Sequence, residues 1–385
     1  MTKRRIKLIL AILGGAAVVG VLLLVAGYYL LTRTINVRDY ATFADLPLYS
    51  WARVDLSDQT QCSDGSDYRI YTRRGESDNL IVHFVGGGAC WDSDTCSKPI
   101  SLPQLNGFYF SYIWDIFRAT LDGIFQTSSA DNPFHDWTSV YIPYCTADFH
   151  TGTTTQTYPL DNGGSVTVAY NGRQNVTEAL DWVFATFDDP GTLLISGESA
   201  GAFGSTFWAP YIARHYAASD VYHLADGSYL QSDQWATIVD QRWKADFPTN
   251  FGYTPVGDLT GDAYLSYSQN PPPNVTFLQV NTLYDGVLTY FEAALNGSDD
   301  AAAFREQWSQ GMRTSTLASA ASDLDYFYFV TDYGMDAETG MTPHTSITAR
   351  LFNTIEEDGV LMRDWLARIV KGGERFSVGE DLLTD

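Results

Sequence analysis

The chain has 385 residues, and its 46 Asp and Glu outnumber its 23 Lys and Arg, which gives a net charge of −23 at pH 7. Five of the basic residues lie before residue 34, so the rest of the chain carries about −28. Such a surface repels nucleic acid and other anionic polymers, and no basic patch relieves it. The composition therefore argues against a nucleic-acid partner, and the length after residue 34 suits one large α/β domain or two small ones.

The first 34 residues have the pattern of a signal anchor. Four basic residues within the first seven positions precede an apolar stretch from Leu8 to Leu31. A membrane-spanning helix needs about 20 apolar residues, whereas the core of a cleaved signal peptide has about 7–15. We therefore expect residues 1–34 to form a cytoplasmic tip and a transmembrane helix, with the remainder outside the cytoplasm. Cleavage near residues 25–27, which would release a secreted protein, is the alternative.

Apolar, β-rich runs alternate with helical patterns from about residue 68 to residue 370. The predicted strands, in chain order, are 68–73, 80–85, 139–144, 192–196, 221–224, 275–280 and 326–330. The predicted helices are 175–187, 200–216, 287–295, 301–321 and 347–370. This alternation is typical of a mostly parallel sheet with helices on both faces. We expect residues 35–385 to form one domain of this α/β class.

A segment rich in aromatic residues, 102–125, stands out from this alternation. Its aromatic side chains are Phe108, Tyr109, Phe110, Tyr112, Trp114, Phe117 and Phe125. One interpretation is a helical insertion packed on the core. The other is a cap whose aromatic rings line a pocket for an acyl chain or a sugar.

The chain has four cysteines, Cys62, Cys90, Cys96 and Cys145. An even number outside the cytoplasm, where thiols are oxidised, predicts two disulfides. Four cysteines allow three pairings, and the short interval favours Cys90 with Cys96, which leaves Cys62 with Cys145. No CxxC or His-rich spacing supports a zinc site instead.

The stretch Ile195–Gly201, ISGESAG, follows an apolar strand and precedes a helical pattern. This is the place of a nucleophile elbow, a sharp turn that exposes a serine hydroxyl above the sheet. The predicted nucleophile is Ser199, and the N–H of Ala200 would donate a hydrogen bond to the oxyanion. A plain tight turn is the alternative, because Gly-x-Ser-x-Gly also occurs by chance.

A second oxyanion donor is expected where the predicted strand 80–85 runs into Gly86, Gly87 and Gly88. Glycine-rich loops at this position supply backbone N–H groups in lipases and esterases. A flexible turn or a phosphate cradle is the alternative. The phosphate motifs, however, need a GxGxxG or a lysine, and both are missing here.

The usual chain order in such hydrolases is serine, then acid, then histidine. His344 is the histidine that lies well beyond both Ser199 and an acid at a strand end, so it is the predicted base. Asp285 follows the predicted strand 275–280 and is the favoured acid, with Asp226 as its rival. The acid would fix the imidazole tautomer and stabilise the imidazolium that forms during acyl transfer.

Several longer sequence blocks resemble those of a known protein family. They are CSDGSDYRIYTRRG (62–75), NLIVHFVGGGACWDSDTC (79–96), NPFHDWTSVYIPYCTADFHTG (132–152), YNGRQNVTEALDWV (170–183) and SGESAGA (196–202). With the late Asp285 and His344, the chain from about residue 62 to 370 resembles the pectin acetylesterase, or Notum-like, family of serine hydrolases.

This resemblance implies an α/β-hydrolase fold. The site residues that it implies are the nucleophile Ser199, the acid Asp285, the base His344, the oxyanion-hole residues Gly87, Gly88 and Ala200, and the substrate-facing Trp91. Asp148 and His150 are expected to shape the wall of the site through packing and hydrogen bonds, not to take part in catalysis.

The residues and the resemblance together predict a serine carboxylic-ester hydrolase that acts outside the membrane through an acyl-enzyme intermediate, with no metal and no organic cofactor. An acetylated saccharide is the first expectation for its substrate, and a longer acyl ester, as for a Notum-like deacylase, is the second. A hydrolase fold kept as a non-catalytic surface binding module is the alternative from another class. An acidic enzyme would be repelled by acidic pectin, so the family name is weak evidence for the substrate.

Overall fold

The computed structural model describes residues 3–101, 106–272 and 274–384, and the side chains of residues 3–17 lie outside this description. The strands are β1 (Ile35–Asn36), β2 (Trp51–Asp55), β3 (Arg69–Arg73), β4 (Leu80–Phe84), β5 (Thr138–Ile142), β6 (Thr154–Pro159), β7 (Ser165–Tyr170), β8 (Thr192–Glu198), β9 (Asp220–Asp226), β10 (Val275–Thr282), β11 (Tyr326–Thr331), β12 (Glu356–Glu357) and β13 (Val360–Leu361).

The helices are α1 (Lys3–Thr32), α2 (Ser93–Cys96), α3 (Asp115–Ala119), α4 (Gly172–Thr186), α5 (Ala200–His215), α6 (Trp235–Thr237), α7 (Phe247–Asn250), α8 (Leu259–Gln269), α9 (Gly286–Leu295), α10 (Ala301–Ala320), α11 (Met362–Val370) and α12 (Asp381–Thr384). Short 3-10 helices are η1 (Val37–Asp39), η2 (Phe43–Asp45), η3 (Gly123–Phe125) and η5 (Arg350–Asn353), and η4 (Ile238–Arg242) is a π-helix.

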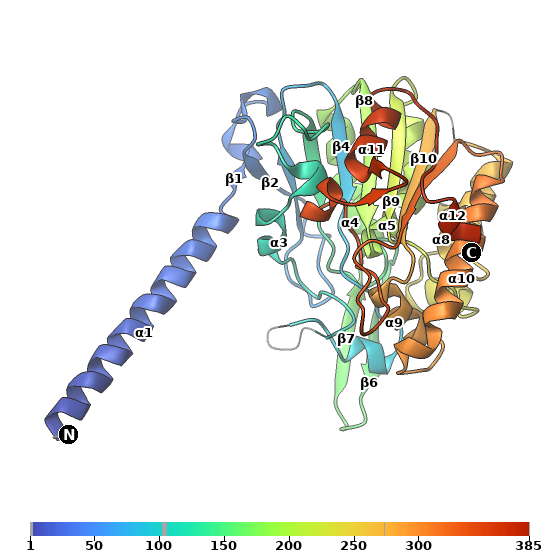
Figure 1. Ribbon diagram of the computed structural model, residues 1–385. Coiled ribbons are helices and arrows are strands. Elements are labelled where there is room, and N and C mark those ends of the chain that lie inside the picture. Colours follow the sequence, from blue (N-terminus) through green and yellow to red (C-terminus); the bar gives the residue numbers. More distant parts are fainter. Residues whose placement is uncertain (1–2, 102–105, 273, 385) are drawn as a thin grey trace.

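Nine of the described strands form a central sheet in the order β1-β2-β3-β5-β4-β8-β9-β10-β11, and β6–β7 and β12–β13 form separate two-stranded sheets. The run from β5 to β11 is parallel throughout, whereas β3 pairs antiparallel with both β2 and β5. Helices cover both faces of this mixed sheet (Figure 1). The central strands β4 and β5 are buried along their whole length, which is expected for strands covered on both faces. The predicted fold class is therefore confirmed.

Each of the seven predicted strands is present, with ends that differ by a few residues. The predicted helix 347–370 is wrong in its first half, where the chain forms η5 and the hairpin β12–β13 before α11 begins. The cause is the pair Asp358-Gly359, whose φ angles of 52° and 75° fit a two-residue hairpin turn. The helical spacing of apolar residues beyond the turn masked this signal.

The aromatic segment has less helix than predicted. Residues 102–105 lie outside the described part, and the rest forms only the short helices α3 and η3 among loops. Its rings divide between the two expected roles. Phe125 is buried in the core, Phe110 and Phe117 line the large cavity described below, and Phe108 does both.

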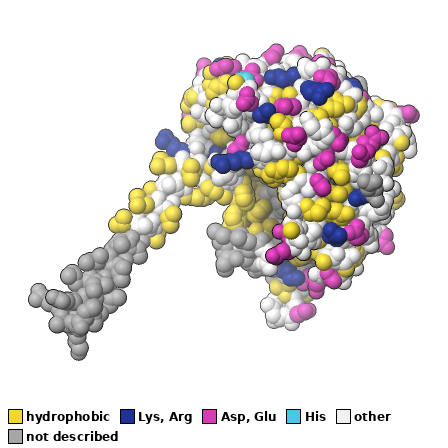
Figure 2. Space-filling view, viewed as in Figure 1, with side chains coloured by type: hydrophobic (Ala, Val, Ile, Leu, Met, Phe, Trp, Pro, Cys, Tyr) yellow, Lys and Arg dark blue, Asp and Glu magenta, His cyan; other side chains and the backbone are white. Residues whose placement is uncertain are grey.

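The predicted membrane span falls within α1, which projects from the domain (Figure 1). Its residues 8–17 lie outside the part whose side chains are described. From residue 18 onward, apolar side chains are exposed along α1, and on the face shown in Figure 2 acidic and basic side chains are interspersed over the domain. Over the described residues, we find no helix with the length and apolar character required to traverse a bilayer. The predicted signal anchor is therefore not confirmed.

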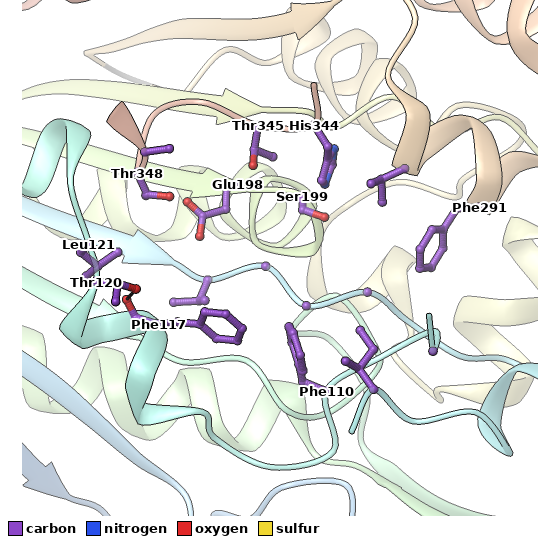
Figure 3. Close-up of a pocket in the computed structure, with 18 of the residues that line it drawn as sticks. Phe110, Phe117, Thr120, Leu121, Glu198, Ser199, Phe291, His344, Thr345 and Thr348 are labelled. Carbon is purple, nitrogen blue, oxygen red and sulfur yellow. Dashed lines mark hydrogen bonds between the residues drawn. The ribbon is translucent and has the colours of Figure 1, made fainter. Parts of the chain in front are cut away.

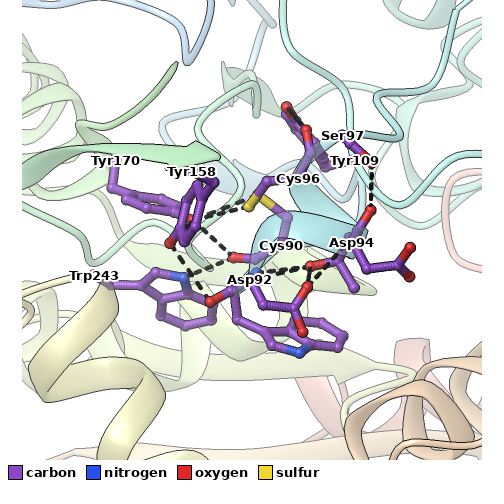
Figure 4. Close-up of a disulfide and its surroundings, with 11 residues drawn as sticks. Cys90, Asp92, Asp94, Cys96, Ser97, Tyr109, Tyr158, Tyr170 and Trp243 are labelled. Carbon is purple, nitrogen blue, oxygen red and sulfur yellow. Dashed lines mark hydrogen bonds between the residues drawn. A yellow bond between two sulfur atoms is a disulfide. The ribbon is translucent and has the colours of Figure 1, made fainter. Parts of the chain in front are cut away.

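Two disulfides join Cys62 to Cys145 and Cys90 to Cys96, as predicted. The second lies just after the glycine loop, among aromatic side chains that bond to its backbone (Figure 4). Nε1 of Trp243 donates to the carbonyl of Cys90 at 2.9 Å, and the hydroxyl of Tyr109 donates to the carbonyl of Cys96 at 3.0 Å. The chain that follows the glycine loop is thus held in place by covalent and hydrogen bonds.

Candidate active site

Ser199 lies on a sharp turn between β8 and α5. Its φ of 53° and ψ of −127° are strained for a residue with a side chain, as expected for a nucleophile elbow. The two glycines of the motif allow this turn. A Cβ on Gly197 would lie 2.1 Å from the carbonyl oxygen of Gly201, and one on Gly201 would lie 2.0 Å from that of Phe84. The pattern Gly-x-Ser-x-Gly is therefore required by the close approach of β4, β8 and α5.

The glycine loop passes directly beside this serine. A Cβ on Gly86 would lie 2.8 Å from the Cβ of Ser199, so only glycine permits this contact. Gly88 has a φ of 76°, and a Cβ there would lie 1.9 Å from the carbonyl oxygen of Phe108. Within the described residues, the N–H groups of Gly87 and Gly88 donate to no backbone carbonyl. Together with the N–H of Ala200 at the start of α5, they are available to an oxyanion.

His344 and Asp285 meet on the same side of the sheet. Nδ1 of His344 donates a hydrogen bond of 2.6 Å to Oδ2 of Asp285. The other oxygen of Asp285 caps α9 by accepting from the N–H groups of Val287 and Leu288, both at 2.9 Å. One carboxylate therefore orients the imidazole and is itself fixed by the start of a helix.

The charge state of His344 follows from these neighbours. Burial by itself would lower the pKa of His344, but the Asp285 carboxylate and its hydrogen bond outweigh burial and raise that pKa above its ordinary value. Nε2 of His344 is buried and has no hydrogen-bond partner in the described residues. Figure 3 shows the ring beside Ser199.

The rival acid, Asp226, has a different position. Its Oδ2 accepts from the N–H groups of Ser346 and Ile347, at 2.6 and 2.9 Å, so it holds the loop that follows His344. Its backbone carbonyl accepts from the N–H of Ser199 at 2.8 Å. Burial raises the pKa of Asp226 to about 6, although the two loop amides act to lower it. Asp226 therefore supports both the nucleophile turn and the histidine loop.

Ser199, His344 and the glycine loop line one cavity of about 1170 Å³ (Figure 3). Aromatic side chains from the segment around α3 and from α9 form much of its wall, including Phe110, Phe117 and Phe291. A polar part carries Glu198, Thr120 and Thr348. This volume is slightly above the usual range for small-molecule sites, which is about 300–1,000 Å³.

Trp91 is not among the described residues that line this cavity, contrary to expectation. It is buried one layer behind, with its ring packed against those of Phe108 and Phe291. Trp91 thus supports the wall that its neighbours form.

Asp148 and His150 are buried and hydrogen-bonded, as expected, but neither is among the described residues that line the cavity. The Asp148 carboxylate accepts hydrogen bonds from Thr146 and from the N–H groups of His150, Gly152 and Gly172. Burial lowers the pKa of His150 to about 4, so its ring is neutral at pH 7. Nε2 of His150 lies 3.1 Å from the carbonyl oxygen of Val85 and fixes the entrance to the glycine loop.

Sequence reasoning missed two parts of the cavity. The first is α9, whose Val287, Tyr290 and Phe291 line it, although the helix itself was predicted directly after Asp285. The second is Glu198. Side chains alternate along a strand, so Glu198 shares a face with Ser196, which is paired in register with His83 of β4. The two-residue alternation of side chains along β8, followed to the end of the strand, could have indicated that Glu198 lies beside Ser199 at the site.

No cluster of His, Cys, Asp and Glu suited to a metal ion occurs within the ranges that the structure describes.

Comparison with known proteins places this arrangement in a family. The family model described as Pectinacetylesterase matches residues 51–246, which is 196 of the 385 residues. The chain belongs to the pectinacetylesterase family. The matched region contains the glycine loop and Ser199, whereas Asp285 and His344 lie beyond it.

Two curated relatives resemble parts of this family member, and both are named palmitoleoyl-protein carboxylesterase NOTUM. The protein of Schmidtea mediterranea is 34% identical over 100 residues, covering 25% of this chain and 18% of the relative. That of Drosophila melanogaster is 31% identical over 147 residues, covering 37% of this chain and 21% of the relative. The chain thus matches about a fifth of the length of these relatives.

Solved structures extend the likeness to most of the fold. The Wnt deacylase Notum from Drosophila, in two crystal forms, superposes with a TM-score of 0.58 in each. One form is 16% identical, and the match covers 84% of this chain and 97% of the solved chain. The other is 17% identical, and the match covers 85% of this chain and 94% of the solved chain. At this identity the comparison shows a shared fold.

Proposed function

We propose that this member of the pectinacetylesterase family is a serine carboxylic-ester hydrolase. The observation that carries the proposal is the hydrogen bond between His344 and Asp285 beside Ser199, at the floor of a cavity that the glycine loop borders. A hydroxyl becomes an effective nucleophile when a base takes its proton, a second group orients that base, and an oxyanion site stabilises the developing charge. His344, Asp285 and the backbone amides of the glycine loop would supply these three functions. The family name and the names of the relatives both refer to carboxylic esters.

In the proposed reaction, Nε2 of His344 takes the proton from Ser199 as the serine oxygen attacks the ester carbonyl. The negative charge that develops on the carbonyl oxygen is stabilised by the N–H groups of Gly87, Gly88 and Ala200. Collapse of this intermediate releases the alcohol, which receives the proton from His344, and leaves an acyl group on Ser199. Water activated by His344 then hydrolyses the acyl-enzyme and regenerates the serine.

The first candidate substrate is an acetylated saccharide, in keeping with the family name. The aromatic wall and the size of the cavity favour a second candidate, an ester with a longer acyl chain. A chain of several carbons would bury apolar surface against Phe110 and Phe291, at about 0.8 kcal/mol for each buried CH₂ group. We place the reaction outside the cytoplasm, because the two disulfides need an oxidising compartment.

The test is hydrolysis of p-nitrophenyl acetate, butyrate, octanoate and palmitate by the full chain, beside Ser199→Ala. We expect the variant to lose at least 10³-fold in kcat while retaining its fold by circular dichroism. Equal rates for the two proteins would reject the proposal that the chain is a serine hydrolase and would support the alternative of a non-catalytic binding module. A maximum at acetate would support the saccharide ester, and a maximum at octanoate or longer would support the acyl pocket.

A further inference from the structure

Glu198 has no part in the reaction proposed above, yet its side chain lies in the same cavity, directly before the nucleophile. The carboxylate is 14% exposed. In Figure 3 it lies on the side of Ser199 where Thr120, Leu121 and Thr348 are drawn, whereas Phe291 lies on the other side. The nucleophile is therefore placed between a polar part of the cavity and an aromatic part.

The Glu198 carboxylate is only partly satisfied by the protein. Its Oε2 lies 3.3 Å from Nε2 of His83, which is fully buried and whose Nδ1 lies 2.9 Å from Oγ of Ser196. The contact between Oε2 and Nε2 lacks hydrogen-bond geometry, so both atoms are buried without a hydrogen-bond partner in the described residues. Within the described residues, Oε1 has no hydrogen-bond partner either and, unlike Oε2, it is not buried, so it is the oxygen left to accept hydrogen bonds from a ligand.

The other charges of the cavity do not neutralise Glu198. Among the described lining residues, Arg350 is the one Lys or Arg, and its side chain is 93% exposed. Nε of Arg350 lies 3.5 Å from Oδ2 of Asp122, a second acidic lining residue. The cation is thus engaged by Asp122 at the rim, and the polar part of the cavity has a local excess of negative charge.

We propose that Glu198 is a specificity-determining residue that accepts hydrogen bonds from hydroxyl groups of the ester and rejects esters that bear a carboxylate. The inference rests on the proposed hydrolase function. It narrows the substrate class to neutral, hydroxyl-bearing esters, so acetylated neutral sugars are favoured over acetylated uronates. Two like charges within several ångströms in a partly buried site repel strongly enough to change relative rates on the order of tenfold or more.

The test uses two pairs of esters that differ mainly in charge. The first pair is an O-acetylated methyl galactoside and the matching galacturonoside, which places the charge on the alcohol. The second is p-nitrophenyl methyl succinate and p-nitrophenyl hydrogen succinate, which places it on the acyl group. For each pair, the quantity compared is the ratio of kcat/KM for the neutral ester to kcat/KM for the anionic one.

We expect wild type to favour the neutral ester at least tenfold in one or both pairs, and Glu198→Gln to reduce that ratio to below about threefold. Glu198→Ser serves the same purpose if the glutamine variant does not fold. Asp181→Asn is the matched control, because Asp181 is an exposed residue of α4 that does not line the cavity, and it should leave the ratio unchanged.

An unchanged ratio in both Glu198 variants, or a wild type without preference in either pair, would overturn the inference while leaving the hydrolase proposal intact. If wild type and Ser199→Ala hydrolyse the neutral succinate ester equally, the hydrolase proposal fails, and the role of Glu198 fails with it.

Discussion

Replacement of Asp285 by asparagine isolates one hydrogen bond of the site. The amide has the shape of the carboxylate, but one of its two positions becomes a donor. Oδ1 of Asp285 accepts from the amides of Val287 and Leu288, so the amide oxygen of asparagine must take that place. Its NH₂ group then faces Nδ1 of His344, where the wild type has an acceptor. The cap at α9 thus prevents the amide flip that would restore the original bond.

An NH₂ group in that position favours the imidazole tautomer with Nδ1 unprotonated and the proton on Nε2. That tautomer cannot take a proton from Ser199. Loss of the corresponding interaction in serine hydrolases lowers kcat on the order of 10⁴-fold, which is about 5.4 kcal/mol of transition-state stabilisation. The free energy of unfolding should change little, since the helix cap is kept. Asp285→Ala removes the cap as well and should cost about 1 kcal/mol more in stability.

The assay is kcat/KM on a p-nitrophenyl ester from pH 5 to 9, with chemical unfolding of each variant. In wild type, activity should rise with pH as His344 loses its proton, with a midpoint above its ordinary pKa of about 6.5 because Asp285 raises that pKa. In Asp285→Asn the residual activity should have a lower midpoint. A variant that keeps activity within tenfold of wild type, with an unmoved midpoint, would refute the orienting role of Asp285.

Two further predictions concern stability. Gly201→Ala should destabilise the fold by several kcal/mol and abolish activity, because the new Cβ would lie 2.0 Å from the carbonyl oxygen of Phe84. Gly257→Ala is the control and should be tolerated, because the space around Gly257 is open. Equal urea-unfolding midpoints for the two variants would contradict this prediction. Serine replacement of the disulfide that spans 83 residues should cost about 4.5 kcal/mol, against about 2.2 kcal/mol for the one that spans 6. Urea unfolding measures both, and the reverse order would show that loop closure does not set the difference.

The sheet was predictable because its strands are buried along their length and read as short apolar runs between helical patterns. The glycine motifs were predictable for a related reason, since the close contacts at Gly86 and Gly201 exclude every other residue. The positions of Ser199, Asp285 and His344 followed from chain order and strand ends, and the structure brings these side chains together.

Other features depend on contacts between distant segments, which local patterns do not encode. Trp91 follows the glycine loop, but whether it faces the cavity depends on Phe108 and Phe291, which reach it from elsewhere in the chain. The role of Asp226 depends on the loop after His344, whose Ser346 N–H donates to its carboxylate from a distant part of the chain. The hairpin β12–β13 was not predicted, although Asp358-Gly359 is a strong local signal for a two-residue turn.

The position of Asp226 has a mechanical consequence. Its carbonyl bonds to the amide of Ser199 and its carboxylate bonds to the amide of Ser346, two residues after His344. Small displacements of β9 therefore carry the serine turn and the histidine loop in the same direction. Both segments are thus tied to one residue of β9, although Ser199 and His344 lie 145 positions apart in the chain.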